Sequence, residues 1–480
     1  MSEELTLRSA TVLRDMVRRR ELSPVELLDA TLARIDRCNP PLNAICTLAA
    51  DSARATAREL EQRQMRGEDL GALGGVPVGI KDVTQVAGMR TTFGSPLYRD
   101  HVPDEDAIVV TRLRAAGAII IGKTNTPEFA AGGNTFNEVF GRTRNPWNPE
   151  RSAGGSTGGG AAALASGMIA LAEGTDLGGS LRIPASFCGV VGLRPSPGLV
   201  PTHPSDYVWD TLQVTGPMAR TAEDVALMLQ VMAGNTPFAP LAQPNADRDF
   251  VGAVRAGPPR ALRLAYTADI AGIGVDAVVE RVCREGAFAM RDAADHVEEI
   301  ALDLAFVRPA FLALRGYWFA AQHLTRLDRA LEFGPNVANN VRAGLSTDMR
   351  TFAEAELVRG RLWHLMRELF TRVDVLLTPC MPVSPFPVEE NYPQTVAGKP
   401  MATYVDWLAP TFVLSMTGLP VACVPAGLDD EGLPVGLQVV GPPRGEELVL
   451  AVAAAVQARR PIGTPLLAQS EGQGSRTTGL

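Results

Sequence analysis

Residues 174–185 read GTDLGGSLRIPA, and residues 154–160 read GGSTGGG. Each stretch is a glycine-rich turn that carries one serine, Ser180 in the first and Ser156 in the second, and each precedes a run that favours a helix. Glycines allow a tight turn that brings backbone N–H groups close to a ligand. The two serines are 24 residues apart, which is room for one short α/β unit. The pattern therefore predicts an α/β fold with two hydroxyl-bearing turns.

A lysine stands at the end of a strand ahead of these turns. Residues 76–80, VPVGI, form a short run that favours a strand, and Lys81 follows it directly. A serine hydroxyl is a poor nucleophile near neutral pH unless a neighbouring group takes its proton. A lysine can take it only as the neutral amine, and burial favours that form because it penalises the charge. Lys81, Ser156 and Ser180 are therefore candidates for a proton relay.

The rest of the chain predicts one α/β domain. Ser23 precedes Pro24, and Glu26 is placed to complete a capping box, so a helix is predicted to begin there and to end near Asn39-Pro40. Farther along, short apolar strands alternate with helices and glycine-rich turns. No tandem repeat is present, so a solenoid is not expected.

Two glycine patterns point to other chemistry and are the weaker interpretations. Residues 117–124, GAIIIGKT, match the phosphate-loop pattern, but residues 119–121 favour a strand and Pro127 interrupts the segment that follows. Residues 154–158, GGSTG, match the nucleophile elbow of α/β hydrolases. That elbow needs a strand before its serine, and Pro146 and Pro149 prevent a central strand there.

Composition narrows the partners and the location. The net charge of -8 provides no basic field for a phosphate backbone, so no nucleic-acid partner is expected. No apolar run is long enough to span a bilayer, so no membrane partner is expected. The six cysteines and five histidines are scattered, which predicts no metal site, no cofactor and reduced thiols in the cytoplasm. A histidine base is the weaker alternative to Lys81, and a homodimer stays open.

In its joint pattern the chain resembles the amidase signature family. The resemblance rests on GIKD at 79–82, GKTN at 122–125 and the two serine blocks at 154–162 and 174–185. Weaker matches, LLTP at 376–379 and the segment 418–441, extend it over nearly the full chain. It implies an α/β fold with a large mixed, mostly parallel twisted sheet that is covered by helices on both faces.

The resemblance also implies a role for each matching residue. Ser180 would be the acylated nucleophile, Ser156 the bridging serine on a cis peptide bond, and Lys81 the base. The oxyanion hole would be formed by the backbone amides of Leu177, Gly178, Gly179 and Ser180. The supporting residues would be Thr157, Thr175, Asp176 and Arg182, of which the last two are expected to hold the turn as a local salt bridge. Thr157 and Gly160 stand where many relatives have serine, so hydrogen bonding near the bridge is expected to differ.

The same resemblance divides the chain. Residues 1–468 would form a single amidase domain, and residues 469–480 a flexible tail. Within the domain, residues 1–70 are predicted to supply N-terminal helices, 71–235 the catalytic core, 236–400 a more variable substrate-pocket region, and 401–468 a C-terminal sheet and helix.

The predicted activity is hydrolysis of a small-molecule amide at a C–N bond other than a peptide bond. Hydrolysis of a carbamate (urethane) or an aryl ester by the same acyl-enzyme chemistry is an alternative, and so is a protein like the A-type subunit of a glutamine amidotransferase, which acts in a complex. Residues 125–128, NTPE, look more like the free-standing amidases. A catalytically silent binding protein is the alternative from another class. Candidates for an apolar substrate pocket, each also explained as core, are Tyr207, Trp209, Phe311, Trp318 and Trp363.

Overall fold

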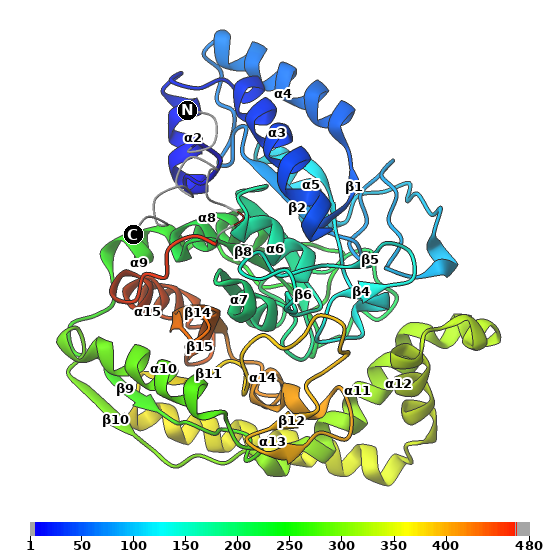
Figure 1. Ribbon diagram of the computed structural model, residues 1–480, viewed down its shortest axis with the longest axis vertical. Helices are drawn as coiled ribbons and strands as arrows, with labels where there is room; N and C mark the ends of the chain where they lie inside the picture. The colour runs from blue at the N-terminus through cyan, green and yellow to red at the C-terminus, as the bar shows by residue number, and fades with distance from the viewer. Residues whose placement is uncertain (1–4, 466, 468–480) are drawn as a thin grey trace, which may run out of the picture.

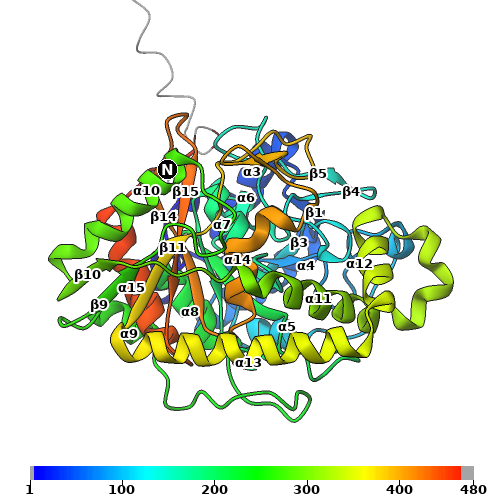
Figure 2. The same ribbon diagram turned by 90° about the horizontal axis from the view of Figure 1, so that it is seen from below.

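The computed structural model describes residues 5–465 and residue 467, and Figures 1 and 2 show it from two sides. Its centre is an 11-stranded sheet in the order β1-β3-β2-β6-β8-β7-β14-β15-β11-β9-β10. Its strands are β1 (Ile45–Leu48), β2 (Pro77–Lys81), β3 (Ile119–Thr124), β6 (Leu171–Asp176), β7 (Val191–Arg194), β8 (Val214–Ala219), β9 (Arg263–Tyr266), β10 (His296–Glu299), β11 (Val375–Pro379), β14 (Val421–Leu428) and β15 (Pro434–Val440). Two small two-stranded sheets pair β4 (Phe136–Asn137) with β5 (Gly141–Arg142) and β12 (Thr395–Val396) with β13 (Lys399–Pro400). The tail predicted for residues 469–480 lies outside the described residues.

The main sheet is mixed. β3, β2 and β6 are parallel neighbours at one end, and β11, β9 and β10 are parallel neighbours at the other. The strands between these two groups pair antiparallel, and so does β1 at the edge.

Helices cover both faces of this sheet (Figure 1). α6 and α7 contact each other and pack on one face, and α8 and α15 contact each other and pack on the other. The predicted fold class, a large mixed sheet covered by helices on both faces, is therefore confirmed. The expectation that the sheet is mostly parallel is not met, because more of its neighbouring strand pairs are antiparallel than parallel. The helices are α2 (Ala10–Arg18), α3 (Pro24–Leu42), α4 (Ala50–Met65), α5 (Ile108–Ala115), α6 (Gly158–Ala165), α7 (Arg182–Cys188), α8 (Ala222–Met232), α9 (Phe250–Ala256), α10 (Ala277–Phe288), α11 (Arg308–His323), α12 (Pro335–Ser346), α13 (Met349–Arg372), α14 (Ala409–Ser415) and α15 (Glu446–Arg459). Within residues 5–465, no helix combines the length and the apolar character that crossing a membrane requires.

Three helices from the middle of the chain form a flank beside the sheet. α11 contacts both α12 and α13, and Figure 2 shows α13 running along the lower side of the molecule with α11 above it. α12 lies to the right of α11 in this view. The flank belongs to residues 236–400, the segment for which the sequence predicts a substrate-pocket role.

The direction of two neighbouring strands decides where the predicted residues meet. β2 and β6 are parallel, so their carboxyl ends reach the same edge of the sheet. β2 ends at Lys81, and β6 ends at Asp176, just before the turn that carries Ser180. The other turn reaches this edge too, because the Thr157 N–H donates to the Ser180 carbonyl oxygen at 3.2 Å.

Helix α3 confirms the predicted start and corrects the predicted end. The Ser23 hydroxyl accepts from the Glu26 N–H at 3.1 Å, and the Glu26 carboxylate accepts from the Ser23 N–H at 2.8 Å. The helix continues to Leu42 with both prolines in its last turn, instead of ending near Asn39-Pro40. Proline has a helical φ but lacks the N–H that would bond the carbonyl four residues back, and the helix nevertheless continues until Asn43 adopts the left-handed conformation.

The phosphate-loop pattern at residues 117–124 lies in the sheet. Residues 119–124 form β3, which pairs with β1 and β2, so this segment is not a loop whose amides could surround a phosphate. The fully buried Lys123 side chain donates to the Thr84 carbonyl oxygen and, at 3.1 Å, to Thr91 Oγ1. The pattern therefore reflects close strand packing.

We predict that Gly122→Ala destabilises the protein. A Cβ at this position would lie 2.1 Å from the Thr47 carbonyl oxygen, so the pairing of β1 with β3 would have to shift. Gly360→Ala is the matched control, because Gly360 is exposed in α13 with nothing within 4 Å of its added Cβ. Thermal unfolding should show a Tm lowered by several degrees for Gly122→Ala, and a gain of up to about 1 kcal/mol in stability for the control. An unchanged Tm for Gly122→Ala would contradict the prediction.

Candidate active site

Lys81 extends its fully buried side chain toward two hydroxyls. Its Nζ lies 2.7 Å from Ser156 Oγ and 2.9 Å from Thr175 Oγ1. Burial lowers the pKa of Lys81 to about 7, and the Glu173 and Asp176 carboxylates oppose that shift without cancelling it. Near neutral pH, roughly half of these side chains are therefore uncharged.

Ser156 lies in the turn that leads into α6. The peptide bond between Gly155 and Ser156 is cis, and the Ser156 side chain is buried beside Lys81. The next residue, Thr157, is also buried, and its Oγ1 has no hydrogen-bond partner among the described residues. Its backbone N–H makes the contact with Ser180 described above, so the two serine turns lie against each other.

The carboxylate of Asp176 organises the turn that carries Ser180. It accepts from the Gly179 N–H at 2.9 Å and from the Leu181 N–H at 3.2 Å. These bonds fix the backbone on both sides of Ser180. They also engage the Gly179 amide, one of the four amides predicted for the oxyanion hole.

Two buried arginines hold the charge of Asp176. Arg182 lies 3.0 Å from the carboxylate, as the sequence predicts, and Arg194 lies 3.3 Å from it. Burial alone would raise the pKa of Asp176, but the two guanidinium charges outweigh burial and hold that pKa well below its usual range. Arg182 also donates to Ser415 Oγ and to Gln438 Oε1, both at 2.7 Å, which ties the turn to the second half of the chain.

Glu173 is a residue of this site that the sequence analysis missed. Its carboxylate accepts from the Lys81 backbone N–H at 3.1 Å and from the Thr84 hydroxyl at 2.8 Å. Burial raises the pKa of Glu173. The sequence contains a pattern that could have identified Glu173, because Glu173 and Thr175 lie two residues apart on β6 and therefore face the same side of the sheet.

Two adjoining hollows lie at this edge of the sheet, and one of them reaches Ser180. The first, which we name the inner cavity, is lined among others by Ser156, Thr175, Gly178, Ser180, Arg315 and Trp318. The second, the outer chamber, has a volume of about 370 Å³. The two hollows share Phe129, Ala130, Thr175, Gln213 and Trp318, so they adjoin each other.

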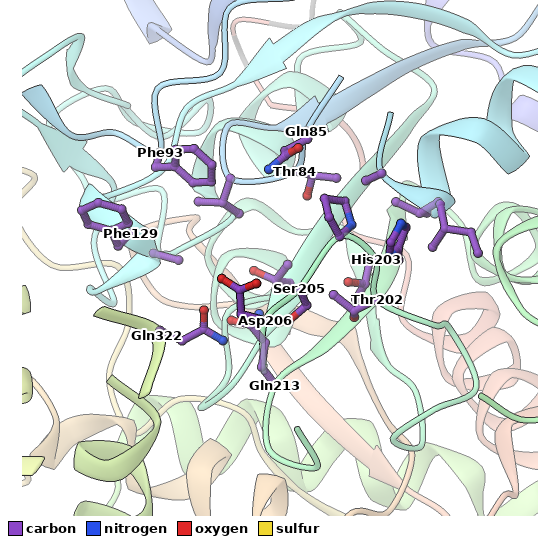
Figure 3. Close-up of a pocket in the computed structure, with 18 of the residues that line it drawn as sticks. Thr84, Gln85, Phe93, Phe129, Thr202, His203, Ser205, Asp206, Gln213 and Gln322 are labelled. Carbon is purple, nitrogen blue, oxygen red and sulfur yellow. The ribbon is translucent and has the colours of Figure 1, made fainter. Parts of the chain in front are cut away.

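Figure 3 shows the outer chamber. Phe93 and Phe129 lie on one side of it, Thr202 and His203 lie on the opposite side, and Gln322 extends toward it from α11. Polar side chains make up much of the wall and include Gln85, Ser205, Asp206 and Gln213.

The aromatic candidates from the sequence separate into four groups. Trp318 lines both hollows. Phe311 is core, fully buried and stacked on Phe412 with ring centroids 4.1 Å apart, and Tyr207 borders a separate hollow. Trp209 and Trp363 are 65% and 37% exposed and line neither the inner cavity nor the outer chamber. The cavity residues that the sequence analysis missed include Gln213, Arg315, Phe319 and Tyr404.

Metal-ligating side chains do not gather here or elsewhere in the part of the chain that the structure describes. Within that part, no three His, Cys, Asp or Glu side chains are grouped so that they could hold an ion. Cys188 is buried near the site, and burial raises the pKa of its thiol above the usual range. A thiol with such a pKa is a poor nucleophile, so the serines are the better candidates.

Comparison with known proteins decides the family. A family model described as Amidase matches residues 26–450. The acylamidase of Rhodococcus erythropolis is 36% identical over an alignment of 464 positions that covers 94% of this chain and 95% of that protein. The A-type subunit of the glutamyl-tRNA(Gln) amidotransferase of Roseiflexus sp. strain RS-1 is 36% identical over an alignment of 480 positions that covers 95% of this chain and 96% of that protein. This chain belongs to the amidase signature family.

Solved structures of other amidase signature proteins agree with that assignment. A bacterial aryl acylamidase of the amidase signature family matches with a TM-score of 0.89 at 28% identity, covering 95% of this chain and 96% of its own. A 6-aminohexanoate cyclic dimer hydrolase in complex with its substrate matches with a TM-score of 0.85 at 28% identity, covering 97% and 100%. The resemblance read from the sequence is confirmed, and this amidase signature protein is a hydrolase of amide C–N bonds.

We predict that Asp176→Asn strongly destabilises this amidase signature fold. The substitution leaves Arg182 and Arg194 buried without their counter-charge, which costs about 3–5 kcal/mol of unfolding free energy. Asp51→Asn is the control, because Asp51 is fully exposed and lies 4.0 Å from Arg54. Thermal unfolding at neutral pH should show a large fall in Tm for Asp176→Asn and almost none for the control.

The pH dependence of this difference has a definite sign. Folding depresses the pKa of Asp176, so its charge stabilises the fold above the ordinary aspartate pKa of about 4, and that stabilisation is lost as the pH falls below it. The difference in stability between the wild type and Asp176→Asn should therefore shrink only in acid. A constant difference down to strongly acidic pH would contradict this.

Proposed function

We propose that the chain hydrolyses a carboxylic amide through an acyl-Ser180 intermediate, with Ser156 as the proton bridge and Lys81 as the base. The observation that carries the proposal is the 2.7 Å contact between Lys81 Nζ and Ser156 Oγ. Ser156 and Ser180 line the same cavity, which supports the proposed transfer of a proton from Ser180 through Ser156 to the amine.

Formation of the acyl-enzyme uses the neutral form of Lys81. Thr175 accepts one N–H of the amine, so the nitrogen lone pair is free to accept from the Ser156 hydroxyl. Ser180 Oγ attacks the carbonyl carbon while its proton moves to Ser156 Oγ and the Ser156 proton moves to Lys81 Nζ. The tetrahedral intermediate then loses the amine.

The leaving amine must receive a proton before it can depart. Ser156 protonates the leaving nitrogen as the C–N bond breaks, and the Lys81 ammonium returns a proton to Ser156. Water then attacks the acyl ester by the same route and releases the acid, which restores all three side chains. Because Ser156 delivers a proton to the leaving group, the arrangement suits amides as well as carbamates and esters.

Backbone amides next to Ser180 would stabilise the oxyanion. The Gly179 amide donates to Asp176, which leaves the amides of Leu177, Gly178 and Ser180 for this role. A single such donor is worth about 3 kcal/mol in the transition state. Asp176 and Arg182 would act as positioning residues that hold the turn.

A second candidate function comes from the relatives that belong to amidotransferases. The structure of the A-type subunit of the Thermotoga maritima glutamyl-tRNA(Gln) amidotransferase matches with a TM-score of 0.72 at 27% identity, below the 0.89 of the aryl acylamidase. We therefore favour a free-standing amidase. Amide hydrolysis by the purified chain alone, without glutamine preference, would separate the two functions.

Two further expectations belong to this proposal. The first is the division of the chain into catalytic residues 71–235 and substrate-pocket residues 236–400. The second is a cytoplasmic location, which the six unpaired cysteines favour.

We predict that a fluorophosphonate probe labels Ser180. Labelling should disappear in Ser180→Ala, and amide hydrolysis should fall by roughly 10⁴-fold or more because the nucleophile is lost. Ser52→Ala is the control, since Ser52 lies on the exposed side of α4 and only bonds the Ala49 carbonyl oxygen. Intact wild-type protein that takes up no label would favour the silent binding protein.

We predict that kcat/KM for an amide rises with pH and levels off above about 7. The active form carries neutral Lys81, and each pH unit below that pKa lowers the fraction of this form about tenfold. Lys81→Met should lower the rate by roughly 1000-fold or more and abolish this limb of the profile. A rate loss below tenfold in Lys81→Met would exclude Lys81 as the base.

A further inference from the structure

We propose that the natural substrate is an amide whose acyl group carries a carboxylate, and that Arg315 binds this carboxylate in the inner cavity. The inference rests on the proposed function and names the substrate class of the same site. It starts from one observation: of the described residues that line the cavity around Ser180, Arg315 is the only one with a charged side chain.

Arg315 is buried but has no carboxylate partner. Its side chain lies on α11, and the residue is only 5% exposed. No Asp or Glu within residues 5–465 forms an ion pair with it, and the nearby Asp406 already pairs with Arg308. A buried cation is costly unless an anion compensates it. A substrate anion supplies this compensation.

The guanidinium offers one open edge. Its Nε donates to Asn340 Oδ1 at 3.0 Å and its Nη2 donates to the Tyr404 hydroxyl at 2.7 Å, so the side edge is occupied. A guanidinium has five N–H groups, and the remaining three, two on Nη1 and one on Nη2, donate to no protein atom in the described part of the chain. This end edge presents two parallel N–H bonds, which match the two oxygens of a carboxylate.

Aromatic rings and a tight helix crossing hold that edge in place. The guanidinium carbon lies 4.8 Å from the ring centroid of Phe319 and 5.6 Å from that of Tyr404. α11 and α12 cross closely beside Arg315, where a Cβ on Gly344 would lie only 1.9 Å from the Gly316 carbonyl oxygen. This crossing brings Asn340 on α12 within reach of Arg315, so the cation is preorganised before a ligand binds.

We assign the acyl side of the substrate to the inner cavity because this cavity is the more buried of the two hollows. Most residues lining this cavity are buried, whereas the outer chamber includes exposed residues such as Glu105, Thr202 and Asp206. The amine leaves first and water must then enter, so the amine should occupy the open chamber while the acyl group stays on Ser180 inside. The carboxylate that meets Arg315 therefore belongs to the acyl group.

The test compares two para-nitroanilides, one of succinic acid and one of isocaproic acid, which differ by a carboxylate against a neutral isopropyl group of similar size. The wild type should show a kcat/KM at least about tenfold higher for the succinyl compound. Arg315→Gln should remove this preference, chiefly by raising KM for the succinyl compound, because the contact exists before and during the reaction. Release of nitroaniline measures both.

Arg342→Gln is the matched control. Arg342 lies on the exposed side of α12 and bonds only Asn339, so its loss removes one positive charge from the same helix pair without altering the cavity. It should keep the wild-type preference. Turnover of the isocaproyl compound and the Tm of Arg315→Gln show whether that variant is folded.

Two results would overturn the inference alone, and a third would overturn the proposed function as well. A wild type that labels with fluorophosphonate but does not prefer the succinyl compound would refute the carboxylate, whatever the variants do. A folded Arg315→Gln that keeps the preference would refute Arg315 as its binding residue. Absence of both turnover and Ser180 labelling would instead overturn the proposed function, and the inference with it.

Discussion

The carboxylate of Asp176 ties the turn that carries Ser180 to the rest of the fold. It accepts two backbone N–H groups of that turn and sits between two buried guanidinium groups, one of which reaches Ser415 and Gln438 in the second half of the chain. The position of Ser180 therefore depends on strands and helices that are distant in the sequence. A local turn becomes a rigid part of the core because its one charge is compensated there.

Burial has opposite consequences for the two charges at this edge of the sheet. Asp176 keeps its charge because two arginines compensate it, whereas Lys81, at the end of the neighbouring strand, has only more distant carboxylates and a lowered pKa. The parallel pairing of β2 with β6 brings both residues to the same edge. One structural constraint thus provides both a fixed turn and a lysine that can exist as the neutral amine. The proposed relay uses both.

Arg315 belongs to a different part of the molecule. It lies on α11, in the flank of helices beside the sheet, and faces the same cavity as Ser180. The sheet edge carries the residues proposed for bond cleavage, and the flank supplies the residues proposed for substrate selection. This division fits the general rule that a shared framework holds the chemistry while more variable segments determine the ligand.

The sequence by itself determined the family, the fold class and the three relay candidates, because these depend on glycine-rich turns and strand ends whose geometry is local and leaves a pattern in consecutive residues. It also determined the start of α3 at its capping box, but it misplaced the end, since two prolines fit the last turn of a helix. Only the tertiary structure decided that Glu173 contacts Lys81, that Arg194 joins Asp176, that the Gly179 amide is engaged, and that Arg315 faces the cavity. These contacts join residues from different strands and helices, and no short-range pattern records which side chains long-range packing brings together.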